Sequence, residues 1–112
     1  MTVITDEEMD QLRATMKPYT VVLLQVTGKI IGDDIESTMR EHRRRNLELR
    51  ADGVLSIVCP IPEGRGWAAV YIFDAPPDEV RRLMDADPAV EEAIFSYEIH
   101  EGRSFPGDAL RA

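Results

Sequence analysis

The segment VLSIVCPIPEGRGWAAVYIFD, residues 54–74, decides the predicted fold because it holds two strands around one turn. Its first and last parts, VLSIVC and WAAVYIFD, are rich in the β-branched and aromatic residues that favour strands. The intervening PIPEGRG stops the first strand, and its glycines suit a hairpin turn rather than a phosphate-binding loop. The sequence therefore predicts two consecutive strands, around which the other elements can be placed.

One helix and one strand are predicted on each side of this pair. The outer elements are a strand at residues 18–26, a helix from Asp33 or Asp34 to about Ala51, a helix at residues 75–87, one further helical turn at residues 87–93 and a strand at residues 94–101. Gly53 suits the left-handed position that follows a helix. The order β-α-β-β-α-β is typical of the ferredoxin-like α+β fold, which has a four-stranded antiparallel sheet with its helices on one face.

A chain of 112 residues is long enough for one domain, and we place this domain at residues 18–105. Residues 1–17 are predicted to form a helical extension, because Thr5 and Glu8 have the spacing of a capping box. Residues 106–112 form a short tail after the last strand.

Composition excludes several classes of partner. The chain has 13 Lys and Arg against 21 Asp and Glu, a net charge of −8, which argues against binding nucleic acid or an anionic membrane surface. The longest apolar runs, VVLL and WAAVYIF, are far shorter than the roughly 20 residues of a membrane span. The acidic start MTVITDEEMDQL is unlike a signal peptide, and one cysteine permits no disulfide within the chain. We therefore expect a cytoplasmic protein.

The predicted third strand has two unlike faces, because side chains alternate along a strand. The two sets are Ala68, Val70 and Ile72 on one face, and Trp67, Tyr71 and Phe73 on the other. The small aliphatic set suits helix packing, whereas the aromatic set is too apolar to remain in water. We therefore expect a homodimer in which sheets pack face to face. The alternative is that the helix of residues 1–17 folds back over this face.

Two polar residues lie on the predicted buried face of the first domain helix. His42 and Asn46 fall in one helical stripe between Met39 and Leu49. A buried polar group without a partner costs roughly 1–3 kcal/mol, so both side chains must be hydrogen-bonded or must line a cleft. A structural histidine in the core and a histidine facing a cleft both satisfy this requirement.

Asp87 continues the buried face of the second helix beyond Leu83 and Met84. It can cap the next helical turn, with Pro88 in the first position. Because both helices pack on one side of the sheet, Asp87 can also face His42. A carboxylate beside an imidazole fixes its tautomer and prepares it as a general base.

Four segments together resemble one known family: EH (41–42), ADGVLSIVCPIP (51–62), DADPAV (85–90) and AIFSYEIHE (93–101). They are similar to the YCII-related proteins, relatives of muconolactone isomerase, over roughly residues 18–105. The resemblance implies a ferredoxin-like, usually dimeric protein with a His–Asp active site at His42 and Asp87. The few members of known activity include dehydrochlorinases of chlorinated aromatic diols. Cys59 and Ala93 replace glycines that the family usually has, which adds bulk near the expected cleft.

The remaining candidates have less specific signals. Cys59 suits a small buried residue at a strand end better than a nucleophile, since no cation or helix N-terminus is evident to activate it. His42 and His100 lack the spacing of a metal site, so no metal is expected. Trp67 and Tyr71 are typical of an interface core and could also contact a substrate.

The sequence thus predicts a homodimer with cofactor-free acid–base chemistry on a small cyclic or aromatic molecule. His42 would take or deliver the proton, Asp87 would orient it or act as the partner acid, and Asn46 would bind a carbonyl or enolate oxygen. Cys59, Trp67 and Tyr71 are expected to contact the substrate in a cleft between helices and sheet. The alternative is a non-catalytic dimeric module that binds a ligand or a partner.

Overall fold

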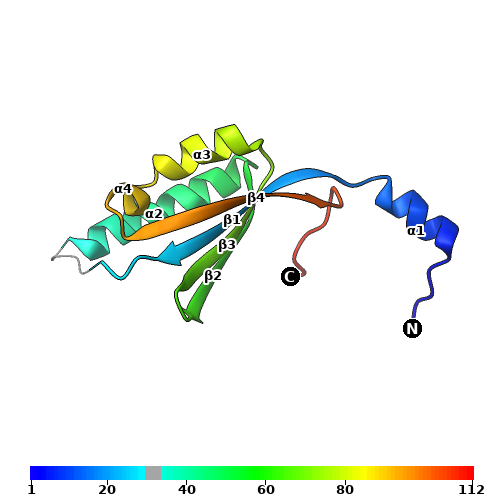
Figure 1. Cartoon of the computed structure of the whole chain (residues 1–112), viewed down its shortest axis with the longest axis horizontal. Coiled ribbons are helices and arrows are strands. Elements are labelled where there is room, and N and C mark those ends of the chain that lie inside the picture. The colour runs from blue at the N-terminus through cyan, green and yellow to red at the C-terminus, as the bar shows by residue number, and fades with distance from the viewer. Residues whose placement is uncertain (30–33) are drawn as a thin grey trace.

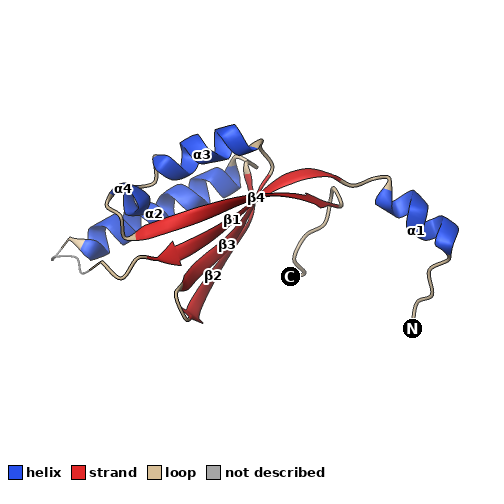
Figure 2. Cartoon of the chain, in the orientation of Figure 1, coloured by secondary structure: helices blue, strands red, loops and turns tan. Residues whose placement is uncertain are grey.

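Four strands form one antiparallel sheet in the computed structural model, which describes residues 1–29 and 34–112 apart from the side chains of residues 63 and 64. The elements are α1 (Asp6–Arg13), β1 (Lys17–Val26), α2 (Ile35–Ala51), β2 (Leu55–Gly64), β3 (Trp67–Phe73), α3 (Pro77–Asp85), α4 (Pro88–Glu91) and β4 (Phe95–Ser104). The strand order is β2-β3-β1-β4, and α2, α3 and α4 cover one face (Figure 2). The predicted ferredoxin-like fold is confirmed, with α4 as the predicted extra turn.

The hairpin formed by β2 and β3 is longer than predicted. β2 was predicted to stop at Cys59, but it continues through Pro60 to Gly64. Proline is tolerated there because β2 is an edge strand of the sheet. The turn residues Arg65 and Gly66 have φ angles of 54° and 101°. Positive φ angles at both positions are typical of the two-residue turns that match the twist of a β-hairpin.

The helix-covered face of β3 is the aromatic one, and the prediction that assigned it to a dimer interface is wrong. Tyr71 and Phe73 are each 1% exposed, and their rings pack edge to face with centroids 6.1 Å apart. They belong to the core with Val22, Leu24, Leu55, Ala69, Val80 and Met84. The two sets alternate as predicted, but a periodicity of two does not reveal which set faces the helices.

The other face of the sheet carries the smaller aliphatic set, and none of the described helices lies over it (Figure 2). Antiparallel pairing puts directly opposed residues on the same face, and Val70 pairs with Leu23 on one side and with Cys59 on the other. The apolar side chains that follow from this pairing are Val21, Leu23, Ile57, Val70 and Ile72. We call these five residues the open face.

A two-stranded ribbon projects beyond the domain. β3 starts to pair with β1 at Thr20, whereas β4 pairs with β1 from Lys17 onward. Residues 17–19 of β1 and 102–104 of β4 therefore form a ribbon of two strands, which leads to α1 at one extreme of the molecule (Figure 1). No α1 residue is buried. The structure therefore contradicts the alternative in which this helix folds back over the sheet.

Helix ends follow the predicted signals in part. The capping box is confirmed, because Thr5 Oγ1 accepts from the Glu8 backbone N–H at 3.1 Å. Gly53 adopts the predicted left-handed conformation, with φ of 79°. Asp34 occupies the N-cap position of α2 without a side-chain cap bond, and Asp33 lies outside the described residues. Among the helices described, none has the length and apolar character needed to cross a membrane.

The corrected orientation of β3 predicts unequal costs for two neighbouring substitutions. Phe73→Ala should lower the free energy of unfolding by about 3–5 kcal/mol, since it leaves a cavity in the core. Ile72→Ala should cost the monomeric chain clearly less, because Ile72 lies on the open face, where its own chain buries it only partly. Urea unfolding of both variants measures the difference, and equal losses would contradict the assigned orientation.

Candidate active site

The side of α2 that faces the sheet is polar where it is most buried. The buried residues of this helix are Thr38, His42 and Asn46, each four positions from the next. This spacing aligns them on one face, because residues four apart in a helix lie one above the other. The predicted polar stripe is therefore real, and its side chains must find partners inside the domain.

Asp87 is the partner of His42, as the sequence predicted. Its Oδ2 lies 2.8 Å from His42 Nδ1, and its Oδ1 lies 3.0 Å from the same nitrogen. The same carboxylate is the N-cap of α4, where Oδ1 accepts from the backbone N–H groups of Ala89 at 2.8 Å and Val90 at 3.4 Å. The cap and the histidine partner are thus one residue, and the two roles that the sequence left as alternatives coexist.

This contact fixes the histidine tautomer. An ionised carboxylate can only accept hydrogen bonds, so Nδ1 carries the proton and donates it to Asp87. In neutral His42 the lone pair then lies on Nε2, the nitrogen turned away from Asp87. Nε2 is consequently the atom of this pair that can accept a proton.

Two further side chains surround Nε2. Tyr71 Oη lies 3.3 Å from it and Asn46 Nδ2 lies 3.4 Å from it, while Asn46 Nδ2 donates to Tyr71 Oη at 3.0 Å. The Phe95 ring lies beside the imidazole with centroids 5.3 Å apart. The contacts to Nε2 are longer than typical hydrogen bonds, which makes them weak. We call Asp87, His42, Asn46 and Tyr71 the polar tetrad.

Tyr71 is kept neutral by its surroundings. Burial raises the pKa of Tyr71 to about 12, the hydrogen bond from Asn46 acts in the opposite direction, and the negative charge of Asp87 raises it further. The phenol therefore keeps its proton at physiological pH and can donate it. It can donate to Nε2 in the neutral state, or to an oxygen that approaches the same position.

The tetrad is closed in this structure, which differs from the expected cleft. Exposure is 5% for His42, 8% for Asn46 and 1% for both Tyr71 and Asp87. Both nitrogens of His42 contact side chains rather than backbone. Over the described residues, every buried side-chain nitrogen and oxygen has a hydrogen-bond partner. The tetrad is thus a satisfied polar network inside the domain.

Two predicted substrate contacts are not in this network. Cys59 is exposed and pairs with Val70, so it lies on the opposite face of the sheet from Tyr71. The irregular pairing of β2 between Leu55 and Ile57 shifts its alternation and turns Cys59 outward. Trp67 is 39% exposed at the start of β3, four residues from Tyr71, or about 13 Å along an extended strand.

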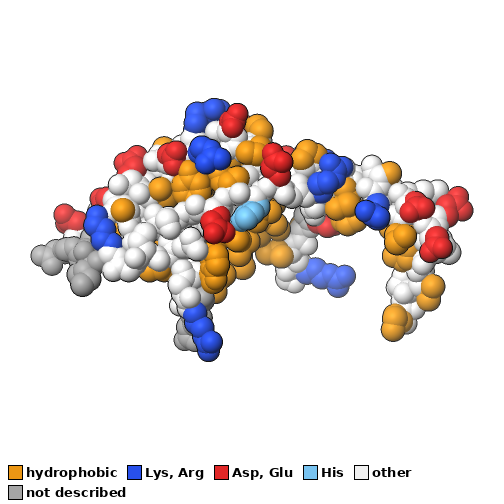
Figure 3. Space-filling model, in the orientation of Figure 1, with side chains coloured by type: hydrophobic (Ala, Val, Ile, Leu, Met, Phe, Trp, Pro, Cys, Tyr) orange, Lys and Arg blue, Asp and Glu red, His pale blue; other side chains and the backbone are white. Residues whose placement is uncertain are grey.

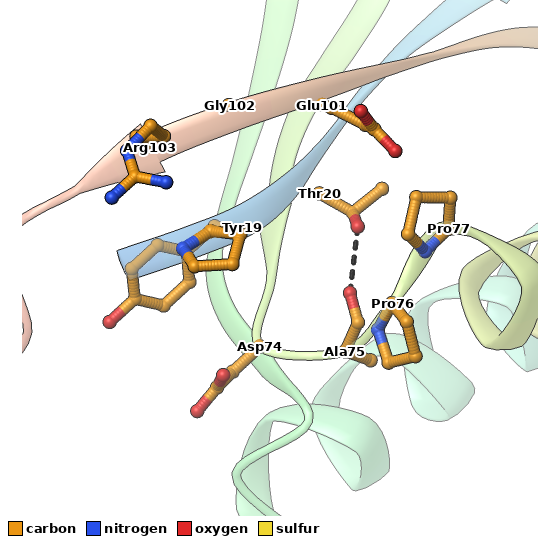
Figure 4. A pocket seen from close by; sticks show the side chains of 10 residues that line it. Tyr19, Thr20, Asp74, Ala75, Pro76, Pro77, Glu101, Gly102 and Arg103 are labelled. Atoms are coloured by element: carbon orange, nitrogen blue, oxygen red, sulfur yellow. Dashed lines mark hydrogen bonds between the residues drawn. The ribbon is translucent and has the colours of Figure 1, made fainter. Parts of the chain in front are cut away.

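A separate cavity of about 700 Å³ lies at the base of the ribbon, where no sequence motif predicts one (Figure 4). It is lined by residues of β1, β4 and the segment before α3, namely Pro18, Tyr19, Thr20, Asp74, Ala75, Pro76, Pro77, Glu101, Gly102 and Arg103. Thr20 Oγ1 donates to the Ala75 carbonyl at 2.7 Å beside it. No member of the polar tetrad lines this cavity, so it is a different place from the His–Asp pair.

The two histidines do not meet. His100 pairs with Val21 and therefore lies on the same side of the sheet as the open face, where its Nε2 is 3.2 Å from Glu98. Within residues 1–29 and 34–112, no three His, Cys, Asp or Glu side chains are grouped as a metal ion would require.

Comparison with known proteins shows that the fold of this chain is similar to the folds of solved structures. The structure resembles 5-chloro-2-hydroxyhydroquinone dehydrochlorinase from Burkholderia phenoliruptrix, solved in complex with 2,5-dihydroxybenzoquinone: the TM-score is 0.51 and the identity 11%, over 73% of this chain and 90% of that chain. A dimeric ferredoxin-like protein of unknown function from Bacteroides fragilis has a TM-score of 0.49 and 16% identity, over 80% of this chain and 97% of that chain. No family model matches the chain, and no curated protein matches it.

The buried phenol predicts a loss of stability at high pH. The folded state raises the pKa of Tyr71 from 10.0 to about 12 and so favours the neutral form. Its contribution to stability is complete below about pH 10 and disappears as the pH rises to about 12. Tyr71→Phe should reduce this alkaline loss, measured as urea midpoints at pH 9 and pH 11. Tyr97, whose pKa burial also raises to about 12, remains in that variant, so part of the loss should persist.

Proposed function

We propose that this chain is a small acid–base enzyme that acts without a cofactor on a small cyclic or aromatic molecule. The observation that carries the proposal is the double contact of Asp87 with His42 Nδ1, at 2.8 and 3.0 Å. It leaves Nε2 as a proton acceptor whose neighbours are side chains with hydrogen-bond donors. Isomerisation, elimination and dehydration need no more than such a constellation.

Each member of the tetrad has a defined role in this proposal. His42 takes a proton at Nε2, and Asp87 holds the ring in place and stabilises the imidazolium that forms. Tyr71 Oη and Asn46 Nδ2 lie next to Nε2 and donate to the oxygen on which negative charge develops. In the loss of HCl from a chlorinated quinol, the substrate gives one proton to Nε2 and releases chloride.

The surroundings of the imidazole favour a flat substrate. Phe95 supplies an aromatic ring beside His42, the Tyr71 phenol reaches the imidazole through its hydroxyl, and aromatic rings pack well against other rings. A substrate oxygen that reaches Nε2 must replace the contacts of 3.3 and 3.4 Å, which are the weakest in the tetrad. The like-folded dehydrochlorinase, solved with a dihydroxybenzoquinone, suggests hydroxylated quinols as the first compounds to test.

The second candidate is a non-catalytic module in which the tetrad only completes the core. The observation that favours it is the closure of the site, with His42 5% exposed and its hydrogen bonds satisfied. A satisfied buried network of this kind fixes how α2, α4 and β3 pack. The two candidates differ in whether a small molecule can reach Nε2.

We also propose that the protein is a homodimer in which the open faces of two copies pack together. The proposal is supported by an aliphatic sheet surface, which includes Val21, Leu23 and Val70 and which no helix within residues 1–29 and 34–112 covers. Large apolar surfaces on soluble proteins mark interaction sites, and a two-fold axis lets one surface pack against its own copy. The proposed dimer still forms through the sheet, but its interface is the open face and not the aromatic face of β3 that the sequence predicted.

Substitution of each histidine separates the two candidates. The unmutated protein should release chloride from 5-chloro-2-hydroxyhydroquinone, and His42→Gln should lower the rate about 100-fold or more, since it removes the general base. His100→Gln is the matched control and should keep the rate, because His100 is exposed on the other side of the sheet. Chloride is measured with an ion electrode, and the melting temperature of each variant is recorded.

The contradicting result is equally specific. If the unmutated protein releases no chloride, and 2,5-dihydroxybenzoquinone does not change the NMR signals of the His42 imidazole, the enzyme proposal fails for this class of compound. The closed core network is then the better account. Asp87→Asn adds information in the positive case, because it keeps an N-cap while removing the charge that stabilises the imidazolium.

Light scattering tests the proposed dimer. At micromolar concentration in 1 M NaCl, which screens contacts between exposed charges, the unmutated protein should have a mass of about 25 kDa, twice the 12.6 kDa of one chain. Val70→Glu should shift it towards the monomer, because a carboxylate buried at the interface lacks a partner. Arg82→Glu, on the exposed surface of α3, is the control and should leave the mass unchanged. A monodisperse monomer of the unmutated protein contradicts the proposal.

A further inference from the structure

The N-terminal arm, residues 1–13, exposes an unusual share of apolar side chains. Ten large apolar side chains of the described residues are exposed, and five of them lie in this arm: Met1, Val3, Ile4, Met9 and Leu12. Figure 3 shows such side chains together with acidic ones at the N-terminal end of the molecule. Apolar groups concentrated in one segment at this density mark a contact surface.

The helix of this arm, α1, needs a partner for its stability. Helices shorter than about 12 residues are marginal in water, and α1 has eight. Its capping box supports only the first turn. Met9 and Leu12, three positions apart, form one apolar stripe, and the acidic residues Asp6, Glu8 and Asp10 flank it. An acidic helix with one apolar stripe fits a surface that is apolar in the middle and basic at its sides.

The outer face of α2 has this complementary character. A shallow groove of about 530 Å³ on it is lined by Arg40, Arg43, Arg44, Leu47, Glu48 and Ala51. Leu47 is 60% exposed and lies one turn from two of the arginines. Arg43 and Arg44 make only long contacts of 3.4 Å, to exposed glutamates of α2 itself. In a chain whose net charge is −8, three arginines against one glutamate, Glu48, give this groove a local positive charge, and we call its six residues the basic patch.

The arm of the same chain does not lie on this patch. α1 is at the far end of the ribbon, away from α2, in a molecule 57 Å long (Figure 1). All its residues are exposed, so its own chain covers no face of it. Every other copy of the chain carries the same patch, so the patch of a second copy is the surface on which α1 can dock.

We infer that α1 of one copy docks on the outer face of α2 of a second copy. Met9 and Leu12 pack against Leu47 and Ala51, and the acidic residues of α1 face Arg40, Arg43 and Arg44. The contact is separate from the proposed active site, because the patch and the polar tetrad lie on opposite sides of α2. It is also separate from the open face of the sheet. Because exposed charges carry part of the contact, it weakens as salt increases.

Disulfide trapping between two copies tests this inference. In a Cys59→Ser background, one chain carries Leu12→Cys and a second, tagged chain carries Leu47→Cys. Mixed at micromolar concentration under mild oxidation, they should form a disulfide-linked pair in high yield. Leu110→Cys, which is 76% exposed in the C-terminal tail, replaces Leu47→Cys in the control mixture and should give a yield at least several-fold lower.

Charge reversal identifies the basic patch as the cause. Arg43→Glu with Arg44→Glu should lower the yield several-fold in the trapping mixture. Arg81→Glu with Arg82→Glu is the matched control on α3, whose two arginines are also exposed, and should leave the yield unchanged. Raising NaCl from 50 mM to 1 M should lower the yield of the unmutated pair.

Three results overturn the inference. The first is a Leu12–Leu47 yield no higher than the Leu110 control. The second is a disulfide that forms within one monomeric chain carrying both cysteines, because α1 then reaches its own α2. The third is an equal effect of both charge reversals. Variants that disrupt the open face, such as Val70→Glu, keep the trapping signal if the two contacts are independent, so failure of the sheet dimer is distinguished from failure of this contact.

Discussion

Burial of one carboxylate constrains how the helices of this domain pack on the sheet. Asp87 is 1% exposed, and a charge in that position is tolerated only when its oxygens are hydrogen-bonded. Two backbone N–H groups of α4 supply part of this requirement, and His42 of α2 supplies the rest. The carboxylate thereby joins the two helices, while the other end of the imidazole meets Tyr71 of β3. Helices and sheet are connected through one chain of polar contacts.

Much of the fold was predictable because its signals are local. The order of elements, the capping box at Thr5, the left-handed Gly53 and the hairpin all depend on residues a few positions apart. The pairing of His42 with Asp87 spans 45 positions. Helical periodicity placed each on a buried face, and the packing of both helices on one side of the sheet allowed them to meet, but only the resemblance to a known family implied that they do.

The predictions that the structure contradicts were wrong for physical reasons. Alternation along β3 separated the aromatic set from the aliphatic one, yet the side that faces the helices depends on tertiary partners. The hydroxyl of Tyr71 finds Asn46 beneath α2, and a buried tyrosine needs such a partner. Cys59 lies on the opposite face of the sheet from the tetrad because of irregular pairing in β2, which depends on the partner strand rather than on neighbouring residues. The cavity at the base of the ribbon forms between segments that are distant in the sequence, so no short motif predicts it.

The prolines of β2 have a consequence for how copies of this protein can meet. Pro60 and Pro62 lie in an edge strand, and each removes an N–H that a neighbouring strand would need. A sheet that cannot extend along this edge is protected from strand-by-strand polymerisation, the route by which exposed edges lead to fibrils. The open face can therefore remain apolar while the edge beside it resists the growth of a continuous β-ladder.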